Sequence, residues 1–308
     1  MEEKISIVIP CYRSEKIIAS VVEEIISILN TLSYEIILVC DGSPDNVWEE
    51  IRKLHTRLKC VHGILLSKNF GQHSATLAGY RMATGDIIIT MDDDGQSDPS
   101  AILKMVDKIN DGYDVVYAKY PTFKKSKFRI FGSWVNRKMA EVFAGKPTGI
   151  QANSFVAMKK FVVNEVIRYT NAFPYLGGLV FRATNNITEI DVTQRKRKEG
   201  SSSYTITKLI KLWINGFTAF SILPLRIASL LGFVFSLAGF IFGIITIIKK
   251  LMNPNIVIGY TSLMVTIFFI GGVILLALGM IGEYIGRIYI SQNQAPQYVI
   301  KDFTGSKH

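Results

Sequence analysis

Short apolar runs alternate with segments of helical periodicity over the first part of the chain, up to about residue 205. Apolar runs bounded by turn residues predict buried strands, and apolar residues recurring every three or four positions predict helices. The predicted strands cover residues 5–10, 34–40, 60–66, 86–91, 114–117, 153–158 and 186–192. The predicted helices cover residues 14–32, 45–58, 74–83 and 128–143. This alternation predicts an α/β fold whose parallel sheet has helices on both faces.

The last third of the chain has a different pattern. Residues 226–248 and 256–282 are almost continuously apolar, and each is longer than the ~20 residues that cross a bilayer. Apolar residues alternate with lysines over 205–225, which predicts an amphipathic helix at the membrane surface, although a helix of the soluble core has the same pattern. We therefore predict a globular domain (1–204), an amphipathic juxtamembrane helix (205–225), a transmembrane hairpin (226–282) and a cytoplasmic C-terminal tail (283–308).

Positive charge narrows the class of partner. The formal net charge is +10, and basic residues cluster in 119–129 and 195–198. Such clusters suit nucleic acid, anionic lipid or phosphorylated ligands. The two apolar spans favour lipid and phosphate, and no nucleic-acid-binding motif is present, so we expect a membrane partner and no nucleic acid.

The same charges indicate the orientation in the membrane. The basic residues of 195–211 and Arg226 outnumber Lys249 and Lys250 between the spans, which places both termini in the cytoplasm, although these two lysines oppose it. The three cysteines lie in or beside predicted strands without metal-ligand spacing, as expected of a reducing compartment.

Three aspartates, Asp92, Asp93 and Asp94, follow the apolar run 87–89. Carboxylates so close together repel one another unless a cation neutralises them, and a divalent metal bound to a phosphate ligand would do so. The alternative is a solvated acidic turn before the next helix. Polar clusters also follow the first two strands, at 10–12 and 41–43, and strand ends of a parallel sheet meet in one crevice. The glycine patterns of dinucleotide sites and P-loops are absent.

The order and spacing of these segments resemble a known enzyme family. Residues 6–12, 41–43 and 92–96 are similar to the successive signatures of family 2 glycosyltransferases of the GT-A fold. The pattern Arg197-x-x-Gly200-x-Ser202-x-Tyr204 resembles the polyprenyl-phosphate branch, which includes dolichyl-phosphate mannose synthase. Residues 69–75, 224–226 and 282–289 resemble bacterial undecaprenyl-phosphate sugar transferases of the 4-deoxy-4-formamido-L-arabinose and glucosyl types. The resemblance covers nearly the whole chain.

This resemblance implies a Rossmann-like GT-A nucleotide-sugar domain and a specific reaction. A sugar passes with inversion from a nucleotide-diphosphate donor, UDP-linked in the closer relatives, to undecaprenyl or another polyprenyl phosphate. The implied place is the cytoplasmic face of a bacterial plasma membrane. The implied cofactor is Mg²⁺ or Mn²⁺, and relatives suggest a homo-oligomer such as a tetramer.

The resemblance also assigns roles to residues of the donor site. Asp94 matches the family's metal ligand, Asp92 the carboxylate beside metal and sugar, and Gln96 a polar residue near the diphosphate or acceptor. Asp93 is expected to be a spacer, since adjacent strand residues face opposite sides. The implied nucleotide-binding residues are Pro10, Tyr12, Asp41 and Asp92. An Asx turn would equally explain Asp41, and a core aromatic would equally explain Tyr12.

The implied acceptor-phosphate site contains Arg195, Arg197, Gly200 and Ser202, with Arg197 also counted as catalytic. A solvated basic turn is the alternative for the arginines. The acceptor phosphate, with a second pKa of about 6, is ionised at neutral pH and needs no strong base, so His73 is expected to pack or hydrogen-bond. The chain departs from the family pattern at Cys40, Tyr120, Val156 and Ser203.

Two other functions fit parts of the sequence. A processive polysaccharide synthase shares the aspartates but carries a Gln-x-x-Arg-Trp motif, and residues 194–198 contain no tryptophan. A non-catalytic nucleotide-sugar sensor on the membrane would not need the complete set of aspartates and phosphate-binding residues. Turnover of a labelled nucleotide sugar distinguishes the two classes.

Overall fold

The computed structural model describes residues 3–121, 149–171, 174–193, 195, 260–293 and 296–304, together with parts of a helical segment between 230 and 252. The contacts within the chain divide it into two compact units. One unit contains residues 1–209 and 294–308, and the other contains residues 210–293. The predicted helices at 128–143 and 205–225 lie outside the described residues.

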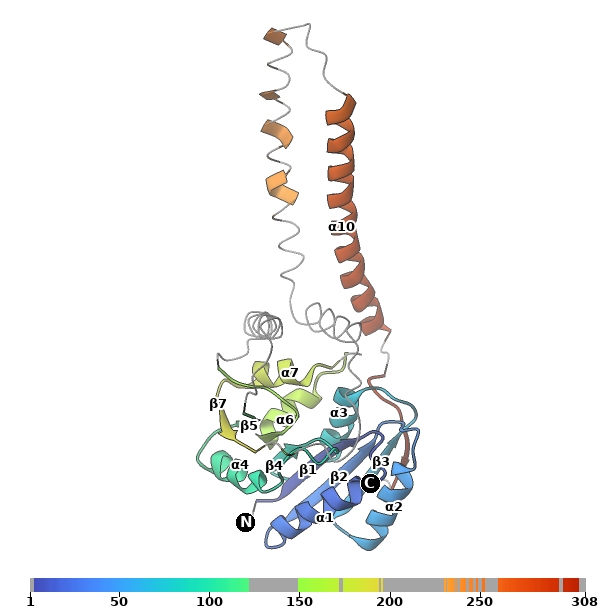
Figure 1. Ribbon diagram of the computed structural model, residues 1–308, viewed down its shortest axis with the longest axis vertical. Helices are drawn as coiled ribbons and strands as arrows, with labels where there is room; N and C mark the ends of the chain where they lie inside the picture. Colours follow the sequence, from blue (N-terminus) through green and yellow to red (C-terminus); the bar gives the residue numbers. More distant parts are fainter. Residues whose placement is uncertain are drawn as a thin grey trace. The chain divides into compact units, whose positions relative to one another are not determined.

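An eight-stranded sheet forms the centre of the first unit (Figure 1), and its strand order is β7-β5-β6-β4-β1-β2-β3-β8. Its strands are β1 (Ile5–Cys11), β2 (Tyr34–Cys40), β3 (Val61–Leu66), β4 (Ile87–Thr90), β5 (Val115–Lys119), β6 (Val156–Lys159), β7 (Ile187–Asp191) and β8 (Ile300–Phe303). The neighbours β3, β2, β1 and β4 are parallel, as predicted, and so are β5 and β7.

Two strands depart from the predicted parallel sheet, and one of them, β8, lies in a segment that was not predicted to form a strand. β6 runs antiparallel to both β4 and β5, and β8 runs antiparallel to β3. Both strands follow long connections, and a long connection can return the chain in either direction. An apolar run specifies burial but not strand direction, so the sequence pattern did not contain this information.

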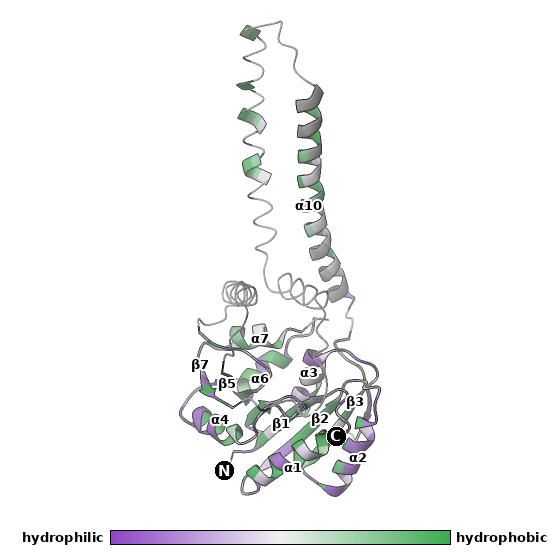
Figure 2. Ribbon diagram, viewed as in Figure 1, coloured by the Kyte–Doolittle hydropathy of each residue, from purple (hydrophilic) through white to green (hydrophobic). Residues whose placement is uncertain are grey.

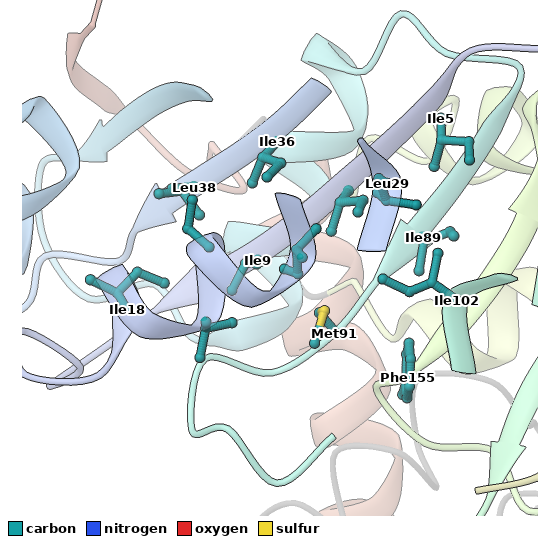
Figure 3. Packing of buried hydrophobic residues seen from close by; sticks show 14 of the residues in the cluster. Ile5, Ile9, Ile18, Leu29, Ile36, Leu38, Ile89, Met91, Ile102 and Phe155 are labelled. Atoms are coloured by element: carbon teal, nitrogen blue, oxygen red, sulfur yellow. The ribbon is translucent and has the colours of Figure 1, made fainter. Parts of the chain in front are cut away.

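Helices connect the strands and cover the sheet. They are α1 (Ile18–Leu29), α2 (Val47–Arg57), α3 (Gln72–Met82), α4 (Ala101–Asn110), α6 (Lys160–Ile167) and α7 (Leu176–Ala183). α1 is shorter than its predicted range of 14–32, and it buries the stripe Ile18, Val21, Val22, Ile25 and Leu29. This stripe packs against sheet residues such as Ile9, Leu38 and Ile89 (Figure 3). The β1 and β2 strands are correspondingly hydrophobic in Figure 2.

The strand order creates a binding crevice at a known place. From β1 the chain proceeds through α1 to β2 on one side, whereas β4 pairs with β1 on the other side. Ligands of open α/β sheets bind at the carboxyl ends of strands where the order reverses in this way. The loops after β1 and β4 are therefore the expected walls of the site.

The end of the chain returns to the first unit. β8 extends the sheet beside β3, and Gly63 N donates to Thr304 Oγ1 at 2.7 Å. The side chain of Gln297 donates to the carbonyls of Tyr169 and Asn171, both at 2.9 Å, and accepts from Arg81 at 3.0 Å. The segment predicted as a C-terminal tail therefore contains the end of a helix and a strand of the sheet.

The second unit contains one long apolar helix, α10 (Tyr260–Gln292). Its window 269–286 has a mean hydropathy of 1.8 and is the one segment of the described residues with the length and composition of a membrane span. The other predicted span, 226–248, is only partly described and includes a shorter apolar helix at 232–241. The rings of Phe235 and Phe269 meet edge to face with centroids 5.1 Å apart.

Candidate active site

Hydrogen bonds join the loops that follow β1, β2 and β4. The Tyr12 N–H donates to Asp93 Oδ2 at 2.9 Å, which connects the first loop to the aspartate triplet. The Arg13 N–H donates to Ser43 Oγ at 2.8 Å, which connects it to the second loop. Arg13 has a φ of +59°, an uncommon value for a residue other than glycine. The predicted convergence of the three polar clusters is confirmed.

Asp41 organises the loop that leads into α3. Its Oδ1 accepts from Phe70 N at 2.7 Å and its Oδ2 from Gly71 N at 2.9 Å. Burial raises the pKa of Asp41, and these two N–H groups oppose that rise. The next residue, Gly42, has a φ of +55°, and a Cβ there would lie 2.3 Å from Lys68 C. The loop therefore requires glycine at this position, and the nucleotide contact of Asp41 stays a prediction.

The outer aspartates of the triplet are bound mainly by side chains. Asp92 Oδ1 accepts from Gln72 Nε2 at 2.6 Å, and Asp92 Oδ2 accepts from Ser154 Oγ. Asp94 Oδ2 accepts from Gln96 Nε2 at 2.6 Å, and Asp94 Oδ1 accepts from Gln96 N at 3.0 Å. Amide and hydroxyl side chains can rotate away, so these carboxylates can exchange partners for a ligand.

The middle aspartate has a different role. Asp93 is directed to the loop after β1 through its bond to Tyr12 N, so it is more than the spacer that was expected. Burial raises the pKa of Asp93 to about 6, and the charges of Asp92 and Asp94 add to this rise. The crowding of negative charge that the sequence indicated is therefore present in the structure.

The outer pair suits a divalent cation. In the described part of the chain, no three His, Cys, Asp or Glu side chains are placed to hold a metal. Mg²⁺ is usually held by one or two carboxylates together with substrate phosphates and water, and Mn²⁺ accepts the same oxygen ligands. Asp92 and Asp94 fit that arrangement, and Gln96 lies beside them through its hydrogen bonds to Asp94.

Arg195, expected at the acceptor phosphate, is bound by two carboxylates in the structure. Its guanidinium donates to Glu24 Oε1 at 2.6 Å and to Asp98 Oδ1 at 2.8 Å, so it is already paired with two carboxylates. Its backbone N–H donates to Gln96 O at 3.0 Å. Arg195 therefore anchors the start of the basic segment beside the aspartates, and its contact with the acceptor phosphate stays a prediction. Arg197, Gly200 and Ser202 lie outside the described residues.

Pro10 and Tyr12, both predicted to bind the nucleotide, differ in their exposure to solvent. Pro10 is a buried residue of β1, opposite Val39 of β2. Tyr12 is 42% exposed, which excludes the alternative of a core aromatic. Tyr12 is therefore exposed at the strand ends, where a ligand can reach it, and the nucleotide-binding roles of Pro10 and Tyr12 stay predictions.

A pocket of about 390 Å³ adjoins Asp92, and sequence reasoning missed most of its residues. Its lining residues come from α3, the ends of β4 and β5, the segment before β6, and α7. They include His73, Asn153, Ser154, Tyr175 and Asp92. Asp92 was predicted as a site residue, and Gln72 and His73 lie in a segment that resembles the family. Asn153, Ser154 and Tyr175 are brought to the pocket by the antiparallel direction of β6 and by α7, neither of which was predicted.

Two departures from the family pattern lie at this site. The Tyr120 hydroxyl is 3.0 Å from Ser97 Oγ, and the charges of Asp92 and Asp94 help to raise the pKa of Tyr120 after burial. Val156 lines the pocket. Neither residue brings a positive charge to the site.

Comparison with known proteins identifies two family models in the chain. Residues 6–167 match the model described as glycosyl transferase family 2, and residues 223–288 match the model described as the GtrB C-terminal hairpin. An undecaprenyl-phosphate 4-deoxy-4-formamido-L-arabinose transferase of Serratia proteamaculans is 32% identical over 99% of this chain and 95% of its own length. The uncharacterized glycosyltransferase YkcC of Bacillus subtilis is 33% identical over 97% of this chain and 94% of its own length.

Solved structures support the fold. Glucosyl-3-phosphoglycerate synthase of Mycobacterium tuberculosis, in complex with Mn²⁺, UDP-glucose and phosphoglyceric acid, superimposes with a TM-score of 0.54. The match covers 70% of this chain and 79% of that protein at 18% sequence identity. The first unit therefore has the fold of that nucleotide-sugar enzyme.

Proposed function

The chain belongs to glycosyl transferase family 2, and from this premise we propose that it transfers a sugar from a UDP-linked donor to undecaprenyl phosphate, with inversion. The observation that carries the proposal is the pair Asp92 and Asp94 in the crevice between β1 and β4, each bound by side chains that can be exchanged. The acceptor class follows the names of its full-length relatives.

Different aspartates would hold the metal ion and the loops that receive the nucleotide. Asp92 and Asp94 would hold Mg²⁺ or Mn²⁺, which acts as a Lewis acid on the departing diphosphate. Asp93 and Asp41 hold the loops that receive the nucleotide, through Tyr12 N and the N–H groups of Phe70 and Gly71. An ionised phosphate can attack the anomeric carbon directly, so no described residue needs to act as a general base.

We propose that the basic segment that begins at Arg195 binds the acceptor phosphate. Arg195 ties the start of this segment to Gln96 O, close to the donor site. We assign the acceptor phosphate to Arg197 and Ser202, with Gly200 allowing a tight turn, because guanidinium groups bind phosphate through paired hydrogen bonds.

A bacterial plasma membrane would cover the second unit. Large apolar side chains of α10 are exposed, among them Leu275 and Ile285, and soluble proteins seldom leave such surfaces uncovered. Because residues before 210 and after 293 belong to one folded unit, the segment between them must cross a membrane an even number of times. We therefore propose a two-span hairpin with both termini at the cytoplasmic face.

The proposed membrane helices of the second unit would also hold several copies of the chain together. In the described residues, a Cβ added at Gly282 or Gly286 would meet no atom within 4 Å. Small residues spaced in this way let membrane helices approach closely. We propose a homo-oligomer, which crosslinking in native membranes would detect as a ladder above the monomer.

Turnover by the full chain tests the function. The protein in nanodiscs is given labelled UDP-sugars, undecaprenyl phosphate and Mn²⁺, with EDTA as the control, and lipid-linked sugar is measured. We expect one sugar per acceptor and no product with EDTA. Many sugars per acceptor would indicate a processive synthase, and nucleotide binding without turnover of any donor would indicate a sensor.

A further inference from the structure

The pocket beside Asp92 has the character of a small-molecule site. Its volume of about 390 Å³ is near the lower end of the range for ligand pockets, ~300–1,000 Å³. Aromatic rings of Tyr80, Tyr117 and Tyr175 lie among polar groups of Asn153 and Ser154. Flat apolar rings with a few polar groups suit a sugar, which presents C–H faces and hydroxyls.

Hydrogen bonds connect residues that line the pocket to the proposed metal site. Gln72 and Ser154 both line the pocket, and both donate to the carboxylate of Asp92. Tyr12 and Asp41, on the loops proposed for the nucleotide, are not among its lining residues. A donor whose diphosphate is held at Asp92 and Asp94 can therefore place its nucleotide on those loops and its sugar in this pocket.

His73 is available to a ligand in this pocket. Its ring meets that of Tyr175 edge to face, with centroids 5.7 Å apart. Within the described part of the chain, the contact of the imidazole is this ring contact, and no hydrogen bond engages it. Burial lowers the pKa of His73, so at neutral pH the ring is uncharged and offers one donor and one acceptor.

The charge of the pocket narrows the class of sugar. Of the described lining residues, Asp92 is the only one that carries a charge at neutral pH. The carboxylate of a uronic acid would be desolvated here, and none of the described lining residues would offer it a positive charge. Burial of an unpaired carboxylate is costly, so the pocket favours an uncharged sugar.

We propose that this pocket receives the sugar of the donor, that the sugar is uncharged, and that His73 and Tyr175 determine which one is accepted. The proposal rests on the function proposed above. His73 supplies a hydrogen bond to a sugar hydroxyl or acylamino group, and Tyr175 supplies its ring face and its hydroxyl.

Calorimetry on the full chain in detergent with Mn²⁺ separates the sugar from the nucleotide. The ligands are UDP, UDP-glucose, UDP-N-acetylglucosamine and UDP-glucuronate, and the variants are His73→Ala and Tyr175→Phe. His62→Ala is the matched control, since His62 is also half-buried and its pKa is also lowered by burial, but it lies on β3 away from the pocket.

We expect His73→Ala and Tyr175→Phe to bind UDP as wild type does. Their affinity for the best uncharged donor should fall about three- to tenfold, because one net hydrogen bond contributes ~0.5–1.5 kcal/mol. The ranking of donors in the transfer assay should also change, and UDP-glucuronate should bind wild type no more tightly than UDP.

Three results would overturn the proposal and leave the proposed function intact. One is an equal loss of affinity for UDP and for UDP-sugars, which would indicate a structural role. Another is an unchanged donor ranking in both pocket variants. The third is a raised KM for undecaprenyl phosphate with unchanged donor affinity, which would assign the pocket to the acceptor. If wild type bound neither UDP nor any UDP-sugar with Mn²⁺, the proposed function itself would fail.

Discussion

The two ends of the parallel strands use carboxylates in opposite ways. At the amino end, Glu35 is 6% exposed and accepts hydrogen bonds from Lys4, Ser6 and Thr84. Burial alone would raise its pKa, but these donors hold the pKa of Glu35 at about 2. At the carboxyl end, burial and crowding raise the pKa of Asp93 to about 6.

The difference indicates what each end is for. A carboxylate that is surrounded by donors gains stability from its charge, whereas crowded carboxylates cost stability until a cation arrives. Glu35 therefore belongs to the stability of the sheet, and the aspartate triplet belongs to its function. Replacing one carboxylate at each end should separate activity from stability.

The largest expected effect is that of Asp94→Asn. The variant keeps the side-chain volume but removes a metal-binding charge, so turnover should fall by about 10²–10³-fold or more, as for loss of a key electrostatic group. The thermal midpoint should stay unchanged or rise, because one like-charge repulsion is lost. Transfer assays and thermal unfolding of the same preparation measure both, and turnover near the wild-type level would contradict the account.

At the amino end of the strands we expect the opposite result, a loss of stability without a loss of turnover. In Glu35→Gln, the buried donors lose a charged acceptor, and the free energy of unfolding should fall by about 2 kcal/mol. Turnover per folded molecule should stay unchanged, because the residue is at the far end of the strands from the site. Urea denaturation with a parallel activity assay checks this, and a loss of turnover without a loss of stability would be contrary to the comparison.

Acid should remove the same stabilisation. The pKa of Glu35 is about 2 in the folded protein and ~4.3 in an unfolded chain, so the folded state binds fewer protons between these values. Its contribution is complete above about pH 5 and is lost as the pH falls through about 2. The stability difference between wild type and Glu35→Gln should therefore shrink over this window, and a constant difference would show that the charge is not its source.

The smallest expected effect concerns Gln72, which donates to Asp92 from the first turn of α3. Gln72→Ala removes one orienting hydrogen bond and should lower kcat/KM by about two- to tenfold, with little change in stability. Gln72→Glu is a sharper probe, since it replaces the donor by a like charge and should reduce turnover further. Equal activity of all three proteins would exclude this positioning role.

Local patterns in the sequence predicted one part of the molecule well. Apolar runs ending in Pro10, Cys40 and Thr90 marked the parallel strands, and their polar ends converge as expected. The features that were missed depend on contacts distant in sequence. β8 pairs with β3, and Arg195 pairs with Glu24, because the fold brings them together, and no local spacing signals either contact.

The aspartate triplet shows the same difference between what a local pattern predicts and what depends on contacts distant in sequence. The triplet was evident, and Asp93 was expected to face the opposite side from its neighbours, but no local pattern indicated that it would hold the loop of Tyr12 while Asp92 faced a pocket. That assignment depends on which neighbours the chain brings to each carboxylate. The sequence thus predicted which carboxylates lie at the strand ends, and the structure was needed to show the neighbours of each one.

The central claim is that Asp92 and Asp94 hold a divalent cation that binds the donor diphosphate. The most direct measurement is a manganese anomalous-difference map of crystals of the full chain grown with UDP-glucose and Mn²⁺. We expect a single strong peak in contact with these two carboxylates and with the diphosphate oxygens. A diphosphate bound in the crevice with no manganese at the aspartates, or a peak bound elsewhere, would contradict it.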